Sequence, residues 1–223
     1  MIALAHRIES ALHACVAVES DDLADLTRIY ESEVNLCLIH RQPEVPLSAF
    51  VTEYLGRSDE IELTIEVCFE RFDFASLLPG CEDIFGYDAW WRDVARLSAA
   101  FCDLFEIERV GLRLRALDKP MCPRFHVDHV PCRLVCTYGG VGSQWLPDKS
   151  VDRTKLGSGA KGLPDEESGL IRDKAAIQTM PPYAVGLMKG TKWEGNEAHG
   201  AVHRSPKFPR DESRRLLLTL DML

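Results

Sequence analysis

Three residues in the second half of the chain, His126, Asp128 and His203, are of types that ligate a redox-active metal. One residue separates His126 from Asp128, and residues i and i+2 of a strand project from the same face. Both side chains can then reach one ion at about 2.0–2.2 Å. With His203, two imidazoles and one carboxylate would occupy one face of an iron(II) ion and leave the opposite positions open. The sequence therefore predicts these three residues as metal ligands and as catalytic residues.

Arg215 opens the apolar run Arg-Leu-Leu-Leu-Thr-Leu near the C-terminus. A guanidinium that enters the core with its strand needs a partner, and a carboxylate can satisfy it through two hydrogen bonds. A salt bridge to Asp211, Glu212 or Asp221 is the ordinary alternative. Arg214 competes with Arg215, because alternation turns only one of them inward. We predict Arg215 as the residue that binds a carboxylate.

The histidines and the aspartate also have ordinary interpretations. An H-x-D motif arises by chance in a chain of this composition, so His126 and Asp128 alone could be a surface histidine beside a solvated aspartate. His203 could be a strand-end histidine with a simple hydrogen bond. His129 follows Asp128 directly, and successive side chains of a strand point to opposite faces. We therefore expect His129 either in the shell around the metal ligands or at the surface.

The chain contains eight cysteines. Its first residues lack the basic segment and long apolar run of a signal peptide, so we expect mostly reduced thiols in a cytoplasm. Cys122, Cys132 and Cys136 bracket the H-x-D motif and could form a structural zinc site with His126. Their spacing is not that of paired C-x-x-C knuckles, and free buried thiols on strands are the competing interpretation.

Composition bounds the classes of function. The 223 residues are 46% apolar and 27% charged, which suits a globular protein. The net charge of -9 disfavours nucleic-acid binding, because phosphate contacts need a basic surface. No segment approaches the ~20 apolar residues that span a bilayer, so no membrane partner is expected. The expected partner is a substrate, either a small molecule or a protein.

Hydrophobic periodicity predicts the elements of the first half. Apolar positions at helical spacing predict helices within residues 20–40, 48–55 and 87–105, with Trp90 and Trp91 packing in the core. Strict alternation over residues 60–69 predicts a half-buried strand. Residues 1–105 are therefore expected to be mainly helical with one strand.

The second half has the character of a β-domain. Short apolar or alternating runs predict strands within residues 110–117, 131–138, 184–188, 201–203 and 214–220. The polar stretch 147–168 has no periodicity and predicts a mobile loop that closes over a substrate. Short strands with turns between them favour a jelly-roll or barrel. The three predicted metal ligands all lie in this second half of the chain.

The H-x-D motif, a second histidine and an arginine opening a final apolar strand resemble the iron(II)/2-oxoglutarate-dependent dioxygenases over residues 106–223. The resemblance implies a double-stranded β-helix that holds iron(II) on His126, Asp128 and His203. It implies that Arg215 pairs with the distal carboxylate of the co-substrate 2-oxoglutarate. It also implies a contact between Tyr138 and that carboxylate.

A narrower resemblance covers most of the chain. The blocks CPRFHVDHVPCRLVCTYGGVGSQWLPD, VGLMKG, AVHRSP and RRLLLTLD are similar to the bacterial domain-of-unknown-function family 1826, and membership implies no established substrate. Several polar or aromatic residues of these blocks are candidates for the pocket lining, and each could equally be structural: Arg124, Arg133, Trp145, Lys189, Arg204 and Ser205.

These patterns predict an α+β protein, with N-terminal helices packed on a C-terminal double-stranded β-helix of the jelly-roll, cupin-like type. Residues 1–105 and 106–223 are expected to form one structural unit. The predicted function is an iron(II)/2-oxoglutarate-dependent oxygenase that hydroxylates an unidentified substrate. One alternative is a cupin-like metal-binding protein without oxygenase activity, serving metal handling. Another is a zinc-stabilised interaction module that uses the cysteines.

Overall fold

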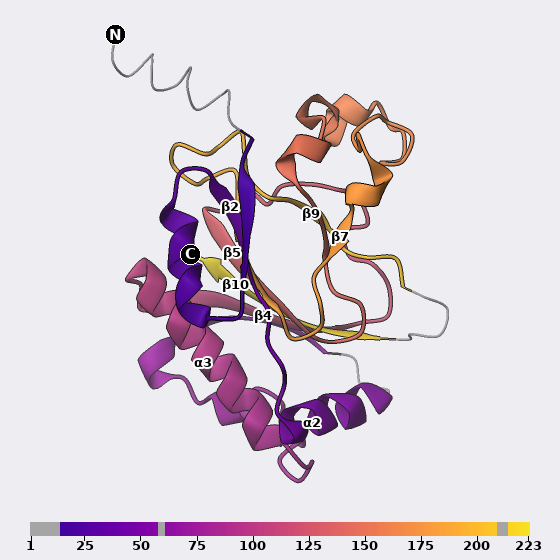
Figure 1. Ribbon diagram of the computed structural model, residues 1–223. Helices are drawn as coiled ribbons and strands as arrows, with labels where there is room; N and C mark the ends of the chain where they lie inside the picture. Colours follow the sequence, from indigo (N-terminus) through magenta and orange to yellow (C-terminus); the bar gives the residue numbers. More distant parts are fainter. Residues whose placement is uncertain (1–13, 58–60, 209–213) are drawn as a thin grey trace.

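A seven-stranded sheet forms the centre of the molecule (Figure 1). The computed structural model describes residues 14–57, 61–208 and 214–223. The strand order is β1-β2-β8-β5-β10-β4-β3, in which β1 and β2 pair in parallel and all other neighbours are antiparallel. The strands are β1 (Val16–Ser20), β2 (Val34–Ile39), β3 (Glu62–Cys68), β4 (Arg109–Leu117), β5 (Cys132–Gly139), β8 (Val185–Lys189) and β10 (Arg215–Met222).

Two α-helices, α2 (Val45–Gly56) and α3 (Tyr87–Phe105), cover one face of this sheet (Figure 1). The predicted helix over residues 87–105 is confirmed, and Trp90, Val94 and Phe101 along it are fully buried. Burying one such side chain stabilises the fold by about 1.5–3 kcal/mol. Gly86 precedes α3 with φ of 85°, and a Cβ there would lie 1.9 Å from a backbone oxygen of α2. Glycine is therefore required where the two helices meet.

Alternation along β5 and β10 divides their side chains between two environments. The even-numbered residues of β10, Leu216, Leu218 and Leu220, pack in the main hydrophobic core beneath the helices. The odd-numbered residues, beginning with Arg215, face the opposite side of the sheet. Since β10 lies between β4 and β5, this second face presents side chains from three adjacent strands.

A small antiparallel sheet lies on that second face. It has the order β7-β6-β9, with β7 (Gln178–Thr179), β6 (Gln144–Leu146) and β9 (Val202–Arg204). Trp145 of β6 packs with Leu36, Val135 and Met188 of the large sheet in a separate buried cluster. Apolar contact between the two sheets therefore encloses the space into which β9 and β10 direct their polar side chains.

The first half contains more strand than its sequence predicted. Within residues 20–40 the structure has a 3-10 helix, η1 (Leu23–Tyr30), followed by the strand β2. The described part of residues 1–105 contributes β1, β2 and β3 to the large sheet, so the expectation of a single strand there was wrong. β3 itself confirms the strand predicted over residues 60–69, of which residue 60 lies outside the described ranges. Both halves of the chain are thus hydrogen-bonded into one sheet.

The stretch 147–168 is organised rather than irregular. It contains three short 3-10 helices, η4 (Asp148–Ser150), η5 (Arg153–Lys155) and η6 (Gly157–Ala160). The buried Asp165 accepts a hydrogen bond of 2.7 Å from the backbone nitrogen of Phe125 and pairs with Arg204. The segment therefore packs against the residues that flank the H-x-D motif, and it forms short helical turns where the sequence predicted a loop without regular structure.

Further 3-10 turns connect the remaining elements: η2 (Phe69–Arg71), η3 (Phe74–Ser76) and η7 (Lys174–Ala176). Among the helices of the described ranges, none combines the length and the apolar composition needed to cross a bilayer.

Candidate metal centre

The two histidines are brought together by a short backbone pairing. His126 and His203 form an isolated antiparallel bridge, in which the His126 nitrogen donates to the His203 oxygen at 2.9 Å and the reverse bond measures 3.0 Å. Their ring centroids are 4.6 Å apart. The H-x-D segment is extended but belongs to no named strand, so its partner across the bridge, β9, fixes its position.

Asp128 completes the cluster. Its carboxylate oxygens lie 3.5 Å from Nε2 of His126 and 3.2 Å from Nε2 of His203. One ligand atom from each of the three residues lies within 4.8 Å of the others. The structure therefore brings together the three residues that the sequence singled out, with two nitrogens and one oxygen converging as a facial ligand set requires.

Hydrogen bonds fix the orientation of both imidazoles. Nδ1 of His126 lies 2.9 Å from the backbone oxygen of Arg124, and Nδ1 of His203 lies 3.1 Å from that of Ala201. A carbonyl only accepts, so each Nδ1 carries the proton and donates it. The neutral tautomer then leaves the Nε2 lone pair free, directed toward Asp128. An outer hydrogen bond of this kind is the usual support of a metal-bound histidine.

The carboxylate of Asp128 has one oxygen supported and one without a partner. Arg133 on β5 lies 2.8 Å from Oδ1 and also pairs with Asp221. Oδ2 is buried, and with Nε2 of His203 unprotonated it has no hydrogen-bond donor among the described residues. A buried carboxylate oxygen without a donor is costly. A cation at this position would satisfy it, so the residues fit a divalent metal.

Electrostatics keep Asp128 ionised. Burial acts to raise the pKa of Asp128, but the two imidazoles and the Arg133 guanidinium outweigh it and hold that pKa well below its usual range. The pKa of His126 is raised, because its pairing with Asp128 outweighs the lowering effect of burial. The cluster thus presents a charged oxygen ligand at neutral pH.

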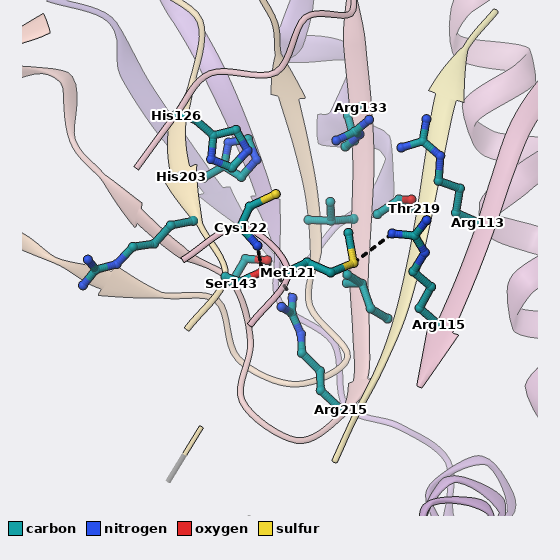
Figure 2. A pocket seen from close by; sticks show the side chains of 14 residues that line it. Arg113, Arg115, Met121, Cys122, His126, Arg133, Ser143, His203, Arg215 and Thr219 are labelled. Atoms are coloured by element: carbon teal, nitrogen blue, oxygen red, sulfur yellow. Dashed lines mark hydrogen bonds between the residues drawn. The ribbon is translucent and has the colours of Figure 1, made fainter. Parts of the chain in front are cut away.

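Arg215 lies in the same pocket as the histidines. His126, His203, Ser143 and Arg215 all line it, and Figure 2 shows Ser143 between the histidine rings and Arg215. Arg215 is 1% exposed, and its guanidinium donates to the hydroxyls of Thr137 (2.9 and 3.2 Å) and Ser143 (2.7 Å). Among the described residues no carboxylate pairs with it. Burial lowers the pKa of Arg215 to about 10. A buried cation with only neutral partners is poised to bind an anion.

The competing partners of Arg215 are placed elsewhere. Asp221 pairs with Arg133 and Arg113 rather than with Arg215. Asp211 and Glu212, the other two candidates, lie outside the described residues. Arg214 donates to the backbone oxygen of Arg57. Of the two neighbouring arginines, it is therefore Arg215 that enters the pocket.

Tyr138 is not brought to the pocket. It lies on the helix-facing side of β5, where its buried hydroxyl donates to Asp93 of α3 at 2.8 Å. Alternation explains the difference, because the neighbouring Thr137 takes the face that Tyr138 was expected to occupy. The contact of Tyr138 with a bound carboxylate, implied by the dioxygenase resemblance, does not fit this geometry.

The cysteines of the possible zinc site are separated by the sheet. Cys132 and Cys136 are buried on the helix-facing side of β5, whereas Cys122 is exposed and lines the pocket on the other side. Within the described ranges they form no common ligand group. His129 is exposed and its Nδ1 lies 2.8 Å from the Thr191 hydroxyl, which agrees with the expectation that it faces away from the metal ligands.

Several pocket residues had only a partial signal in the sequence. Thr137 and Ser143, which hold Arg215, carried none beyond their polar character. Among the six polar or aromatic candidates from the family-like blocks, Arg133, Arg204 and Ser205 line the pocket. Trp145 is buried between the sheets, and the Lys189 ammonium donates to the backbone oxygen of Glu31, far along the sheet from Arg215.

A family model described as "Protein of unknown function (DUF1826)" matches residues 20–221. The chain belongs to this family. The DUF1826 match includes His126, Asp128, His203 and Arg215, so the whole candidate site lies within the region that defines the family. The comparison with curated proteins found no match.

Solved structures with similar folds are oxygenases by description. A rice dioxygenase for auxin oxidation is 10% identical, with 94% of this DUF1826 chain and 83% of that chain covered and a TM-score of 0.48. A Pseudomonas putida prolyl-4-hydroxylase is 10% identical, with coverage of 90% and 97% and a TM-score of 0.46. An Arabidopsis thaliana dioxygenase for auxin oxidation, in a binary complex with 2-oxoglutarate, is 9% identical, with coverage of 94% and 92% and a TM-score of 0.44. At these scores and identities the likeness carries no functional argument, which therefore depends on the site itself.

Proposed function

We propose that this protein is an iron(II)/2-oxoglutarate-dependent oxygenase that hydroxylates a substrate still to be identified. The observation that carries the proposal is a buried guanidinium, Arg215, in one pocket with two histidines whose ligand atoms converge with that of Asp128. The ligand set accounts for the metal, and the arginine accounts for a carboxylate-bearing co-substrate.

Each residue has a distinct task in this proposal. His126 and His203 offer Nε2, and Asp128 offers the oxygen that has no other partner. Arg215 receives the distal carboxylate of 2-oxoglutarate, while Thr137 and Ser143 keep its guanidinium oriented. Bound iron(II) supplies the activation of dioxygen, coupled to oxidative decarboxylation of 2-oxoglutarate. The protein supplies ligand geometry, a fixed cation and a pocket bounded by two sheets.

The fold of the site supports the same proposal. We infer that the two facing sheets form a double-stranded β-helix of the jelly-roll, cupin-like type, with residues 106–223 as its core. The described part of the first 105 residues contributes α2, α3 and the strands β1, β2 and β3 that support it. All eight cysteines are free thiols, which favours a reducing compartment, and we place the protein in the cytoplasm.

The direct test is anaerobic reconstitution with iron(II), followed by titration with 2-oxoglutarate. We expect a visible metal-to-ligand charge-transfer band that saturates at one 2-oxoglutarate per chain. Admission of dioxygen should then release succinate. The matched controls are Asp128→Ala, which should lose both signals, and Arg214→Ala, which should keep both.

Two outcomes would overturn the proposal. If iron(II) binds to the triad but neither the band nor succinate forms, the cupin-like alternative of metal handling without oxygenase activity would replace it. If Asp128→Ala binds iron(II) at the wild-type stoichiometry, the three residues are not the metal site. The zinc-stabilised interaction module is no longer a candidate, because Cys122 lies across the sheet from Cys132 and Cys136.

A further inference from the structure

A second group of metal-ligating side chains lies outside the pocket. Cys15 directly precedes β1, Asp148 opens η4 after β6, and His199 lies in the segment that leads into β9. One potential ligand atom from each lies within 4.8 Å of the other two. The three residues come from distant parts of the chain, so sequence spacing gave no indication of the group.

Distances within the group match those between ligands of one tetrahedral ion. Nδ1 of His199 lies 3.6 Å from Oδ2 of Asp148, and Sγ of Cys15 lies 3.6 Å from Oδ1 of Asn196. With bonds of about 2.1 Å to nitrogen or oxygen and about 2.3 Å to sulfur, a tetrahedral ion separates two N/O ligands by about 3.4 Å. The same geometry separates a sulfur ligand from an oxygen ligand by about 3.6 Å. The Cys15 thiol donates a hydrogen bond to Oδ1 of Asn196, and this separation is also that of two ligands on one ion, so Asn196 is the candidate fourth donor.

Two polar atoms of the group are buried without partners. Nδ1 of His199 and Nδ2 of Asn196 are inaccessible to solvent and form no hydrogen bond with the residues that the structure describes. Asn196 as a whole is 6% exposed and Cys15 is 8% exposed. A histidine nitrogen 3.6 Å from a carboxylate oxygen is too distant for a hydrogen bond. A cation between Nδ1 of His199 and Oδ2 of Asp148 would satisfy the imidazole nitrogen, which has no other partner among the described residues. The amide Nδ2 of Asn196 is a donor and does not bind a cation.

The aspartate is held by outer hydrogen bonds. Arg153 donates from Nε to Oδ1 of Asp148 at 2.6 Å and also donates to the backbone oxygen of Gly200 at 2.8 Å. The backbone nitrogen of Cys15 donates to Oδ2 at 2.9 Å. Oδ1 is thereby occupied, and Oδ2, which still has lone-pair capacity, is directed toward Cys15 and His199. Supports of this kind fix a ligating carboxylate.

We propose that Cys15, Asp148 and His199 bind a structural zinc ion, with the Asn196 amide oxygen in the fourth position. Zinc accepts mixed sulfur, nitrogen and oxygen ligands in tetrahedral geometry. One thiolate and one carboxylate balance its charge. With four protein donors, no position is left for a substrate, so the ion has a structural role and acts independently of the triad.

The consequence of such a site is a tie between three segments. It would join the start of β1, the turn η4 and the segment 190–201, which ends two residues before His203. Segments that are joined through a metal gain stability only when the metal is bound. Zinc would therefore stabilise the backbone that presents His203 to the other metal centre.

Cobalt(II) provides the test, because only a thiolate ligand gives an intense near-ultraviolet charge-transfer band. The experiment uses the full-length Cys122→Ser variant, which lacks the exposed thiol near the triad. Its bound metal is first removed with a chelator. We expect cobalt(II) to produce the thiolate band within two equivalents, since the triad also takes up a divalent ion, and zinc to abolish the band by displacement. The band should persist in Cys122→Ser/Asp128→Ala, which lacks the triad carboxylate.

The proposal would be overturned if folded Cys122→Ser protein shows no thiolate band at saturating cobalt(II). In this measurement none of the proposed zinc ligands is mutated. Loss of the band in Asp128→Ala would also overturn it, by assigning the thiolate to the triad. Cys15→Ser and His199→Ala should each lower zinc content by one ion per chain. Cys37→Ser, a buried cysteine outside the group, should leave zinc content unchanged.

Discussion

Replacement of Arg215 by methionine separates a binding role from a structural one. Methionine has a similar length but carries no charge and no hydrogen-bond donor. Burial lowers the pKa of Arg215 to about 10. At about 1.4 kcal/mol per tenfold change in an equilibrium constant, this corresponds to about 3 kcal/mol for holding the guanidinium without an anionic partner. A carboxylate that binds beside it recovers a free energy of this order.

Two effects of opposite sign follow for Arg215→Met. The Kd for 2-oxoglutarate should rise by about 100-fold, since about 3 kcal/mol of charge-assisted pairing is lost. The free energy of unfolding of the metal-free protein should not fall, and should rise by about 1 kcal/mol, because a buried charge without a counter-ion is removed. The two abandoned hydroxyls, on Thr137 and Ser143, limit that gain.

The assay combines anaerobic titration of the charge-transfer band with urea unfolding of the metal-free protein. Arg214→Met is the matched control and should change neither quantity by more than about 0.5 kcal/mol. Arg215→Lys keeps a charge but loses the planar pair of donors, so its Kd should lie between those of the wild type and Arg215→Met. A destabilised Arg215→Met with unchanged 2-oxoglutarate affinity would refute the reasoning and give Arg215 a purely structural role.

Three further predictions concern the triad and the helix-facing network. Asp128→Ala and His203→Ala should each lower bound iron(II) from one equivalent to a small fraction, as measured by metal analysis after anaerobic gel filtration, and retention of a full equivalent would contradict the ligand assignment. Tyr138→Phe should leave the 2-oxoglutarate Kd unchanged and lower the free energy of unfolding by about 1–2 kcal/mol, because the buried hydroxyl donates to Asp93. Burial acts to raise the pKa of Asp93, but the guanidinium of Arg41 outweighs it and holds that pKa below its usual range. The stability that Asp93 contributes is therefore present at neutral pH and lost as the pH falls below about 4, where the unfolded carboxyl takes up its proton. Urea unfolding should show the wild type losing its advantage over Asp93→Asn across that acid range, and a constant difference would contradict the assignment.

Local periodicity was sufficient for the elements that have one clear solvent side. The helix α3 and the strand β3 alternate between buried and more exposed positions, so their period was readable. In β2 every residue from Val34 to Ile39 is buried, because the strand has neighbours on both edges and side chains packed on both faces. A continuous apolar run has no period, which is why it was joined to a helix.

The sequence predicted those site residues whose type is restricted by the chemistry of metal binding. It did not predict residues whose place in the site depends only on the fold. Few residue types make an iron(II) ligand set, so His126, Asp128 and His203 could be proposed together although they are distant in the chain. Tyr138 and Thr137 lie on opposite faces of β5. The alternation of side chains along a single strand separates the two faces, but it does not show which of them lines the pocket. The group around Cys15 and His199 depends wholly on tertiary structure.

The two histidines show how the fold supports the ligands before any metal binds. Each Nδ1 lies close to the carbonyl oxygen two residues earlier, on Arg124 for His126 and on Ala201 for His203. The backbone bridge between the two histidines makes these arrangements counterparts across one antiparallel pair. Ring position and tautomer are thus set by the main chain, so little ordering is required when a cation arrives. Asp128 differs, because Arg133 supports one oxygen and the other has no donor. Of the three ligands, the carboxylate is therefore the one whose burial is completed by the metal.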